Sequence, residues 1–269
     1  MVAGAPHAPL APPEDGGLFP RDGMVRRITA ERVMLLGGPR ALLLQIAHPM
    51  VAAGVADHSG FDRDPWERLW STLDVVLDVV FGDTVRAGAA ASRVTALHND
   101  VTGSRDGIDY RALDPALLLW VHATLVDSAL VTYGRFVQPL SASDEEGYYQ
   151  EMKRFAQSFR VPTGILPEDL GEFRSYFRKT TETLRVTGEA RRLAARVLEP
   201  PLPFTLLPVR SIQNLITAGL LPEPVRAGYG LRWSAGRERA LRVVSASIRR
   251  TLPLVPAKVR RWPHSLRES

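Results

Sequence analysis

Residues 37–61 read GGPRALLLQIAHPMVAAGVADHSGF and form the longest apolar run of the chain, with no charged residue over 41–56. A helix that is apolar on nearly every side is buried on every side. A membrane span needs about 20 apolar residues, and this run is shorter and is interrupted by Pro49. The stretch therefore predicts a helix at the centre of a protein core.

Start and stop signals for helices recur on both sides of this stretch. Asp-Pro pairs at 64–65 and 114–115 can open helices that run to about residues 81 and 136. A serine and a glutamate with capping-box spacing can open another at residue 143. No sustained alternation of polar and apolar residues, and no hairpin dipeptide between β-branched runs, indicates strands. The pattern predicts an all-α protein.

We expect a single irregular helical domain over residues 23–269, with about eight to eleven helices and buried apolar central helices. The length of 269 residues is sufficient for a sizeable core. Residues 1–22 are rich in Ala, Pro and Gly and predict a disordered tail without the apolar segment of a secretion signal. We therefore expect a cytoplasmic protein.

Several classes of chemistry have no counterpart in the sequence. There is no cysteine, which excludes disulfides, iron–sulfur clusters, thiolate haem ligation and cysteine nucleophiles. The motifs of P-loops, dinucleotide sites, HExxH zinc enzymes and GxSxG hydrolases are absent, as is any Glu-x-x-His pair of a di-iron bundle. The six histidines remain as the candidates for a metal or cofactor site.

Two histidines lie on apolar faces of predicted helices. His98 continues a face that begins at Ala87, and His122 shares a face with Leu118 and Val126. Either imidazole can be a core histidine bonded to a carbonyl or a ligand of a metal. Haem requires one neutral histidine, an apolar slot and basic residues for the propionates, and the sequence offers all three.

Two further histidines have simpler interpretations. His48 precedes Pro49, and we expect it to bond the backbone that this proline leaves without a donor. His58 stands near a turn and is expected to be structural. A zinc site built from these two with His98 and His122 remains open, although their spacing does not propose it.

Arg68 and Thr72 lie four residues apart on the predicted helix 64–81, on the flank of a polar stripe. We expect this helix to be mostly buried, so the guanidinium needs a partner, because an unpaired buried charge is costly. Asp64, one turn earlier, is one partner. A bound anionic group is the other.

The apolar stretch and four further blocks together resemble the MpaB-type oxygenases, the family that shares the catalytic domain of latex-clearing (rubber) oxygenases. The resemblance covers about residues 25–185, in order. It implies an all-helical fold, haem b held by a histidine, and cleavage of double bonds in isoprenoid-like substrates with dioxygen. The blocks are DPWERLWST at 64–72, ALHNDVTG at 96–103, YRALDPALLLWVHATLVDS at 110–128 and YYQEM at 148–152.

The resemblance also implies roles for individual residues. ALHNDVTG stands where the family's axial histidine falls, which favours His98 as the iron ligand. Arg68 and Thr72 would position bound dioxygen, with Arg68 also available to a haem propionate. His122 remains the second candidate for cofactor binding. Ser71 stands where latex-clearing enzymes carry a basic residue, which implies an open or water-bound sixth position on the iron.

We therefore expect a haem b-dependent oxygenase that acts with dioxygen on a small hydrophobic, isoprenoid-like alkene. Without a secretion signal, a small intracellular lipid or terpenoid is favoured over extracellular rubber. Two alternatives remain: a haem-binding sensor or carrier without turnover, and a cofactor-free helical protein of the membrane surface.

Charge is concentrated at the C-terminal end of the chain. Residues 226–269 carry ten arginines and one lysine against two glutamates, a net charge of +9, which leaves −4 for the rest. Apolar residues recur between the arginines, so we expect this region to pack on the core with its arginines in solvent. A peripheral membrane contact through 226–267 is the alternative. No aromatic platform or recognised module indicates nucleic acid.

Overall fold

A computed structural model describes residues 16–58, 65–105, 107–200 and 203–266, with the side chains of 65–69, 204 and 266 outside this description. The described residues form fourteen α-helices and one β-hairpin, which confirms the all-α class and exceeds the expected eight to eleven helices. The helices are α1 (Met24–Thr29), α2 (Gly38–Ala47), α3 (Pro49–His58), α4 (Pro65–Phe81), α5 (Thr84–Asn99), α6 (Pro115–Phe136), α7 (Ala142–Ser158), α8 (Leu170–Thr183), α9 (Gly188–Leu198), α10 (Leu207–Leu220), α11 (Glu223–Gly228), α12 (Ala235–Thr251), α13 (Ala257–Arg260) and α14 (Pro263–Leu266). The 3₁₀ segments include η1 (Arg32–Gly37), η3 (Thr163–Ile165), η4 (Phe204–Leu206) and η5 (Leu252–Leu254), and the strands are β1 (Thr102–Arg105) and β2 (Ile108–Arg111).

The apolar stretch that opens the sequence forms two helices at the centre, α2 and α3. They break at His48, whose backbone is extended at φ −77° and ψ 123°. The Met50 N–H donates to His48 Nδ1 at 3.3 Å, so this imidazole caps the helix that begins at Pro49. His48 thus bonds the backbone beside Pro49, as expected, but its partner is the Met50 N–H and not a carbonyl that the proline leaves without a donor.

Arg40 anchors α2 at the centre of the fold although its side chain is only 2% exposed. Its guanidinium donates to Leu220 O at 2.7 Å and to Ser128 Oγ at 2.6 Å, and it forms an ion pair with Asp127. A buried charge is tolerated when it is paired and hydrogen-bonded in this way. These contacts tie α2 to α6 and to the end of α10.

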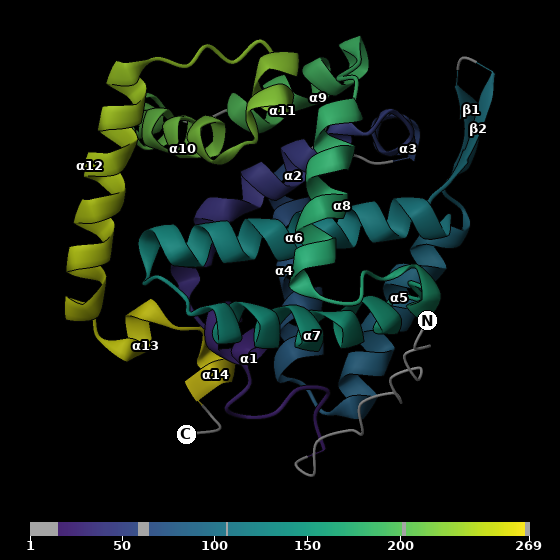
Figure 1. Cartoon of the computed structure of the whole chain (residues 1–269), viewed down its shortest axis with the longest axis horizontal. Helices are drawn as coiled ribbons and strands as arrows, with labels where there is room; N and C mark the ends of the chain where they lie inside the picture. Colours follow the sequence, from purple (N-terminus) through teal and green to yellow (C-terminus); the bar gives the residue numbers. More distant parts are fainter. Residues whose placement is uncertain (1–15, 59–64, 106, 201–202, 267–269) are drawn as a thin grey trace, which may run out of the picture.

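The long helix α6 runs across the middle of the molecule, with α7 and α8 in front of it in Figure 1. By length and composition it is the one described helix that could cross a membrane, but 67% of its most apolar window is buried inside the fold. A helix enclosed by other helices needs an apolar surface on all sides. The apolar composition of α6 is therefore explained by its burial at the centre of the core.

Helices α4 and α5 pack on one another and are joined at Gly82 and Asp83. The Asp83 carboxylate accepts the Arg86 N–H at 2.7 Å and caps α5. Asp78 on α4 pairs with Arg86 and Arg93 on α5, which fixes the alignment of the two helices. The expected bounds of α4, from the Asp-Pro pair to Gly82, agree with the structure.

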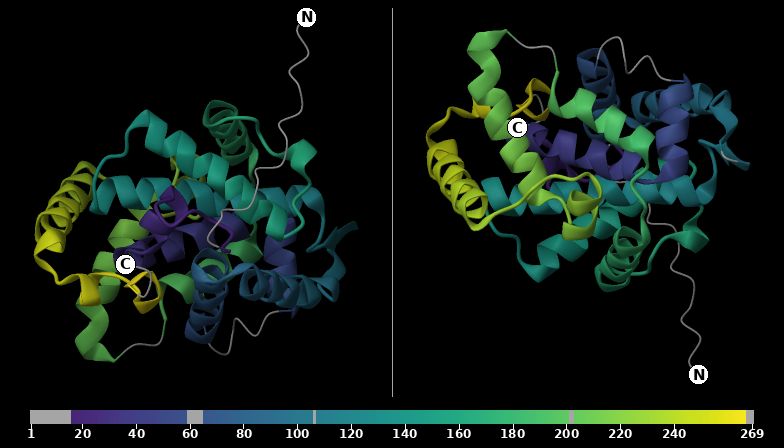
Figure 2. Two further views of the ribbon diagram at one scale, coloured as in Figure 1. Left: turned by 90° about the horizontal axis from the view of Figure 1, so that it is seen from below. Right: turned by 90° about the horizontal axis from the view of Figure 1, so that it is seen from above.

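The hairpin of β1 and β2 follows α5 and corrects the expectation that the chain has no strands. Residues Thr102–Arg105 pair with Ile108–Arg111, and Gly107 in the connecting turn has φ +76°. Glycine adopts this left-handed conformation without steric cost. The hairpin lies at the edge of the molecule opposite α12 (Figures 1 and 2).

Two other expectations need correction. Phe19 is fully buried in the core and the Thr84 N–H donates to Gly16 O at 2.8 Å, so the predicted disordered tail 1–22 extends too far; residues 1–15 lie outside the described chain. The capping box of α7 is formed by Ser141 and Asp144, two residues before the predicted one.

The basic C-terminal region packs on the core, as expected. On α12, Leu241 is 1% exposed and clusters with Phe136 of α6 and Ile216 of α10. Beyond it, the Trp262 N–H donates to Ala30 O at 3.0 Å. The end of the described chain is therefore fastened to its beginning.

Candidate functional site

His98 lies on the inward face of α5, as its apolar pattern predicted. Ala87 and Ala91 on the same face are buried, and Val94 and His98 are half-buried. The Arg68 position of α4 and His98 of α5 stand in the halves of these helices farthest from the Gly82-Asp83 turn, which are together called here the open end of the pair.

The His98 imidazole lines a hollow of about 740 Å³ beside the β-hairpin. The wall combines residues from the last turn of α5, both strands and the first turn of α6. It carries one cation, Arg111, and two carboxylates, Asp109 and Asp114. The lining residues are His98, Asn99, Thr102, Gly103, Asp109, Tyr110, Arg111, Leu113, Asp114 and Pro115.

The open end leaves large apolar side chains uncovered. Trp70 on α4 is 48% exposed and Leu97, next to His98, is 71% exposed. Ser71 and Thr72 are exposed as well. The expectation that this helix is mostly buried therefore holds only for its second half, and the Arg68 side chain lies outside the described part of the chain. Uncovered apolar groups of this kind suit contact with a hydrophobic cofactor or substrate.

His122 occupies a different environment, enclosed between α6 and α7. It is 4% exposed and stacks on Phe155 at 6.5 Å between ring centroids, and neither ring nitrogen has a hydrogen-bond partner among the described residues. Burial lowers the pKa of His122 to about 4, so the imidazole is neutral at pH 7. A neutral imidazole with a free lone pair can ligate a metal, but His122 is not among the residues that line the hollow.

One wall of the hollow is held by contacts that the sequence analysis did not anticipate. Tyr110 is 3% exposed and donates to Asp57 at 2.6 Å, and Arg105 pairs with both Asp57 and Glu189. These contacts join the hairpin to α3 and α9. Their partners lie about 50 or more residues apart in the chain, so no local pattern announced them.

His58 reinforces the same wall. Its Nε2 lies 2.9 Å from Thr102 O, and its ring packs edge-on to Tyr110. This placement agrees with the expected structural role. Among the described residues, no three His, Asp or Glu side chains group as metal ligands, so the four-histidine zinc site is not formed.

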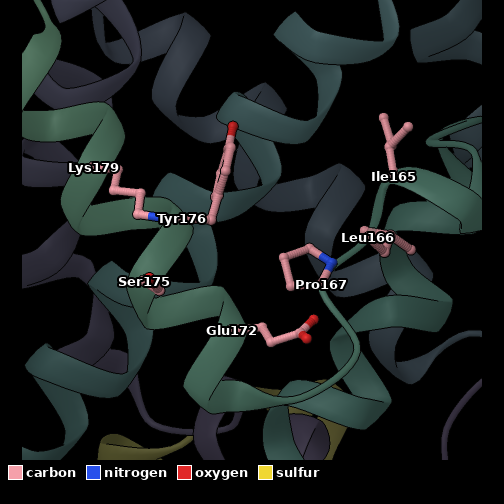
Figure 3. Close-up of a pocket in the computed structure, with 7 residues that line it drawn as sticks. All are labelled: Ile165, Leu166, Pro167, Glu172, Ser175, Tyr176 and Lys179. Atoms are coloured by element: carbon pink, nitrogen blue, oxygen red, sulfur yellow. The ribbon is translucent and has the colours of Figure 1, made fainter. Parts of the chain in front are cut away.

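A second hollow of about 470 Å³ lies between α8 and the loop before it (Figure 3). The Tyr176 ring stands between the helix and the loop, with Lys179 one turn along and Pro167 opposite. Burial raises the pKa of this tyrosine. None of the predicted site residues lines this second hollow.

The residues around His98 fit a haem in three respects. The His98 residue lines a hollow of sufficient size, Arg111 supplies a cation in its wall, and Tyr110, Leu113 and Pro115 supply apolar surface. The carboxylates of Asp109 and Asp114 in the same wall do not suit the apolar faces of a macrocycle.

Two uncharacterised relatives and the model of one family match the chain. An uncharacterised protein of Mycobacterium bovis and an uncharacterised protein of Mycobacterium tuberculosis are each 27% identical to the chain over 226 residues, which covers 80% of this chain and 87% of the relative. No solved structure matches the chain significantly. The model of one family, described as the ER-bound oxygenase mpaB/B'/rubber oxygenase catalytic domain, matches residues 25–250.

That match reaches 65 residues beyond the resemblance seen in the blocks, to the end of α12, and includes α4, α5, the hairpin and α6. The whole scaffold of the His98 hollow thus falls inside the catalytic domain. The chain belongs to the mpaB/rubber oxygenase catalytic-domain family.

Proposed function

We propose that this protein is a haem b-dependent oxygenase that acts with dioxygen on a small hydrophobic substrate bearing a double bond. Family membership supports the oxygenase class. The observation that carries the finer proposal is the position of His98, half-buried in the wall of a hollow at the open end of the α4–α5 pair.

In this proposal His98 holds the iron and Arg111, with Arg68, offsets the charge of the propionates. Haem, when bound, supplies an iron that activates dioxygen for attack on a double bond. A histidine that binds the iron must be neutral. Carbonyl oxygens at the end of α5 and in the hairpin can accept a hydrogen bond from its second ring nitrogen and so keep that nitrogen protonated.

The remaining residues would bind and orient. The Thr72 hydroxyl and the Arg68 guanidinium donate hydrogen bonds and would steady a negatively polarised oxygen. Trp70 and Leu97 would cover the apolar part of the substrate and exclude water. Tyr110 and Asp57 would keep the hairpin wall in place through their hydrogen bond.

An absorption spectrum of the purified protein with a pyridine haemochrome assay tests the cofactor. We expect a Soret band that His98→Ala abolishes and His122→Ala retains, with both variants folded by circular dichroism. A spectrum without a Soret band after reconstitution with haemin would refute the cofactor. Loss of haem in His122→Ala alone would move the ligand to α6.

Oxygen uptake with a terpenoid alkene tests the reaction. We expect uptake that depends on both the haem-loaded protein and the alkene, with carbonyl products by mass spectrometry. A haem-loaded protein that consumes no oxygen with a panel of such alkenes would instead be a carrier or sensor.

A further inference from the structure

The outer face of α12 is a continuous cationic surface. The helix buries Leu241 and Ser245 against the core, so the residues on its opposite side point to solvent. Four exposed arginines stand there, and within the described residues none of them pairs with a carboxylate. They are Arg239, Arg242, Arg249 and Arg250, and Val243 among them is 61% exposed.

An apolar projection continues this surface at the end of α12. Leu254 in η5 is 81% exposed and Val259 in α13 is 59% exposed, with the exposed Lys258 beside them. The segment is held firmly, because Arg260 and Arg261 pair with the buried Glu31. Two large aliphatic side chains are thus presented to solvent on an anchored turn.

Cations and aliphatic groups on one anchored surface match the chemistry of an anionic bilayer. Each arginine near such a membrane strengthens binding by roughly fivefold, and aliphatic side chains gain by entering the headgroup region. A nucleic acid would attract the arginines but has no apolar region that could bury Leu254 and Val259. These two exposed side chains therefore favour a membrane over a nucleic acid as the partner.

We propose that the outer face of α12 together with the η5–α13 turn, called here the basic edge, docks on anionic membranes with Leu254 and Val259 inserted. This goes beyond the oxygenase proposal and does not depend on it. The basic edge and the β-hairpin lie at opposite ends of the molecule in Figure 1, and Figure 2 shows the same separation. Docking would hold the hollow away from the bilayer, so it serves as an anchor and not as an entrance for substrate.

Vesicle co-sedimentation of the full chain tests the charge half of the proposal. We expect binding to vesicles of phosphatidylcholine with 30% phosphatidylglycerol (about that fraction suffices for a strong surface potential), none to pure phosphatidylcholine, and weakening by salt. Arg249→Gln with Arg250→Gln should reduce binding at least tenfold. Arg178→Gln with Arg185→Gln removes the same charge from exposed positions on and after α8 and should have little effect.

Leu254→Ser tests the insertion half, with Val85→Ser, of similar exposure on α5, as its matched control. We expect severalfold weaker binding only for Leu254→Ser. Absence of binding to anionic vesicles, equal losses in the two arginine pairs, or no effect of Leu254→Ser would each overturn the proposal. So would tighter binding to a duplex DNA than to the vesicles. All substituted side chains are exposed, and an unchanged melting temperature would show that the fold is intact.

Discussion

The centre of the fold buries even a charged side chain, whereas the open end of the α4–α5 pair leaves large apolar side chains exposed. At the centre even the guanidinium of Arg40 is enclosed and bonded to three partners. At the open end Trp70 and Leu97 remain exposed and His98 is half-buried. Burying such a side chain would stabilise the fold by about 1.5–3 kcal/mol. The centre of the fold has this contribution and the open end lacks it. Unused apolar surface of this kind marks a place for a ligand.

The largest expected effect lies at the centre. Arg40→Ala leaves Asp127 and Ser128 without their partner in a mostly buried setting and should destabilise the fold by about 3–5 kcal/mol. Urea unfolding of the protein without cofactor measures this. The double variant Arg40→Met with Asp127→Leu should recover most of the loss, since no charge is then unpaired. A loss below 1 kcal/mol in Arg40→Ala would show that the centre tolerates disruption as readily as the surface.

The second effect concerns His122, which also lies inside the core. Its pKa is lowered to about 4 from an ordinary 6.5, because burial disfavours the charged form. Between these values the unfolded state binds a proton that the folded state does not, so stability falls as the pH drops from about 6.5 to 4. The full loss is about 3 kcal/mol. Unfolding curves at pH 7 and pH 4.5 should differ by less in His122→Leu than in the parent chain; equal differences would contradict this role.

The smallest effect tests the open end. Arg68→Ala should lower oxygenase turnover at least tenfold, about 1.4 kcal/mol of barrier, and leave stability nearly unchanged. Asp64→Ala should cost about 1 kcal/mol of stability through a lost helix cap and leave turnover per folded molecule unchanged. Steady-state oxygen uptake and thermal unfolding separate the two. If both substitutions change only stability, and equally, Arg68 belongs to the cap and not to the site.

Local sequence signals specified much of the fold. The Asp-Pro pairs marked the starts of α4 and α6 because proline is suited to the first turn of a helix. At α6 the Asp114 carboxylate also accepts the Ala116 N–H and caps the helix. The β-hairpin was missed although Asp106-Gly107 is a strong hairpin dipeptide, since its flanking strands are too short and polar to show alternation. The burial of Phe19 was not predicted, because this residue lies in a Pro- and Gly-rich segment whose composition is typical of disordered chains.

The sequence predicted only part of the candidate site. The apolar spacing placed His98 on an inward face, because that depends on one helix alone. The same spacing could not separate it from His122, whose enclosure depends on α7 packing over α6. Nor could it show that Tyr110 bonds Asp57 or that Trp70, Ser71 and Thr72 of α4 are exposed. Such properties arise from contacts between distant segments, which a local pattern does not contain.

The buried Glu31 ties the beginning of the domain to residues that are synthesised much later. Its side chain is 3% exposed, and its partners Arg260 and Arg261 follow 229 and 230 residues later. At about 5–20 residues per second, the ribosome delivers those partners roughly 10–50 s after Glu31 emerges. Arg40 likewise waits for Leu220, 180 residues downstream. The nascent chain must therefore carry its central helix without these anchors until residues 220, 260 and 261 have been synthesised.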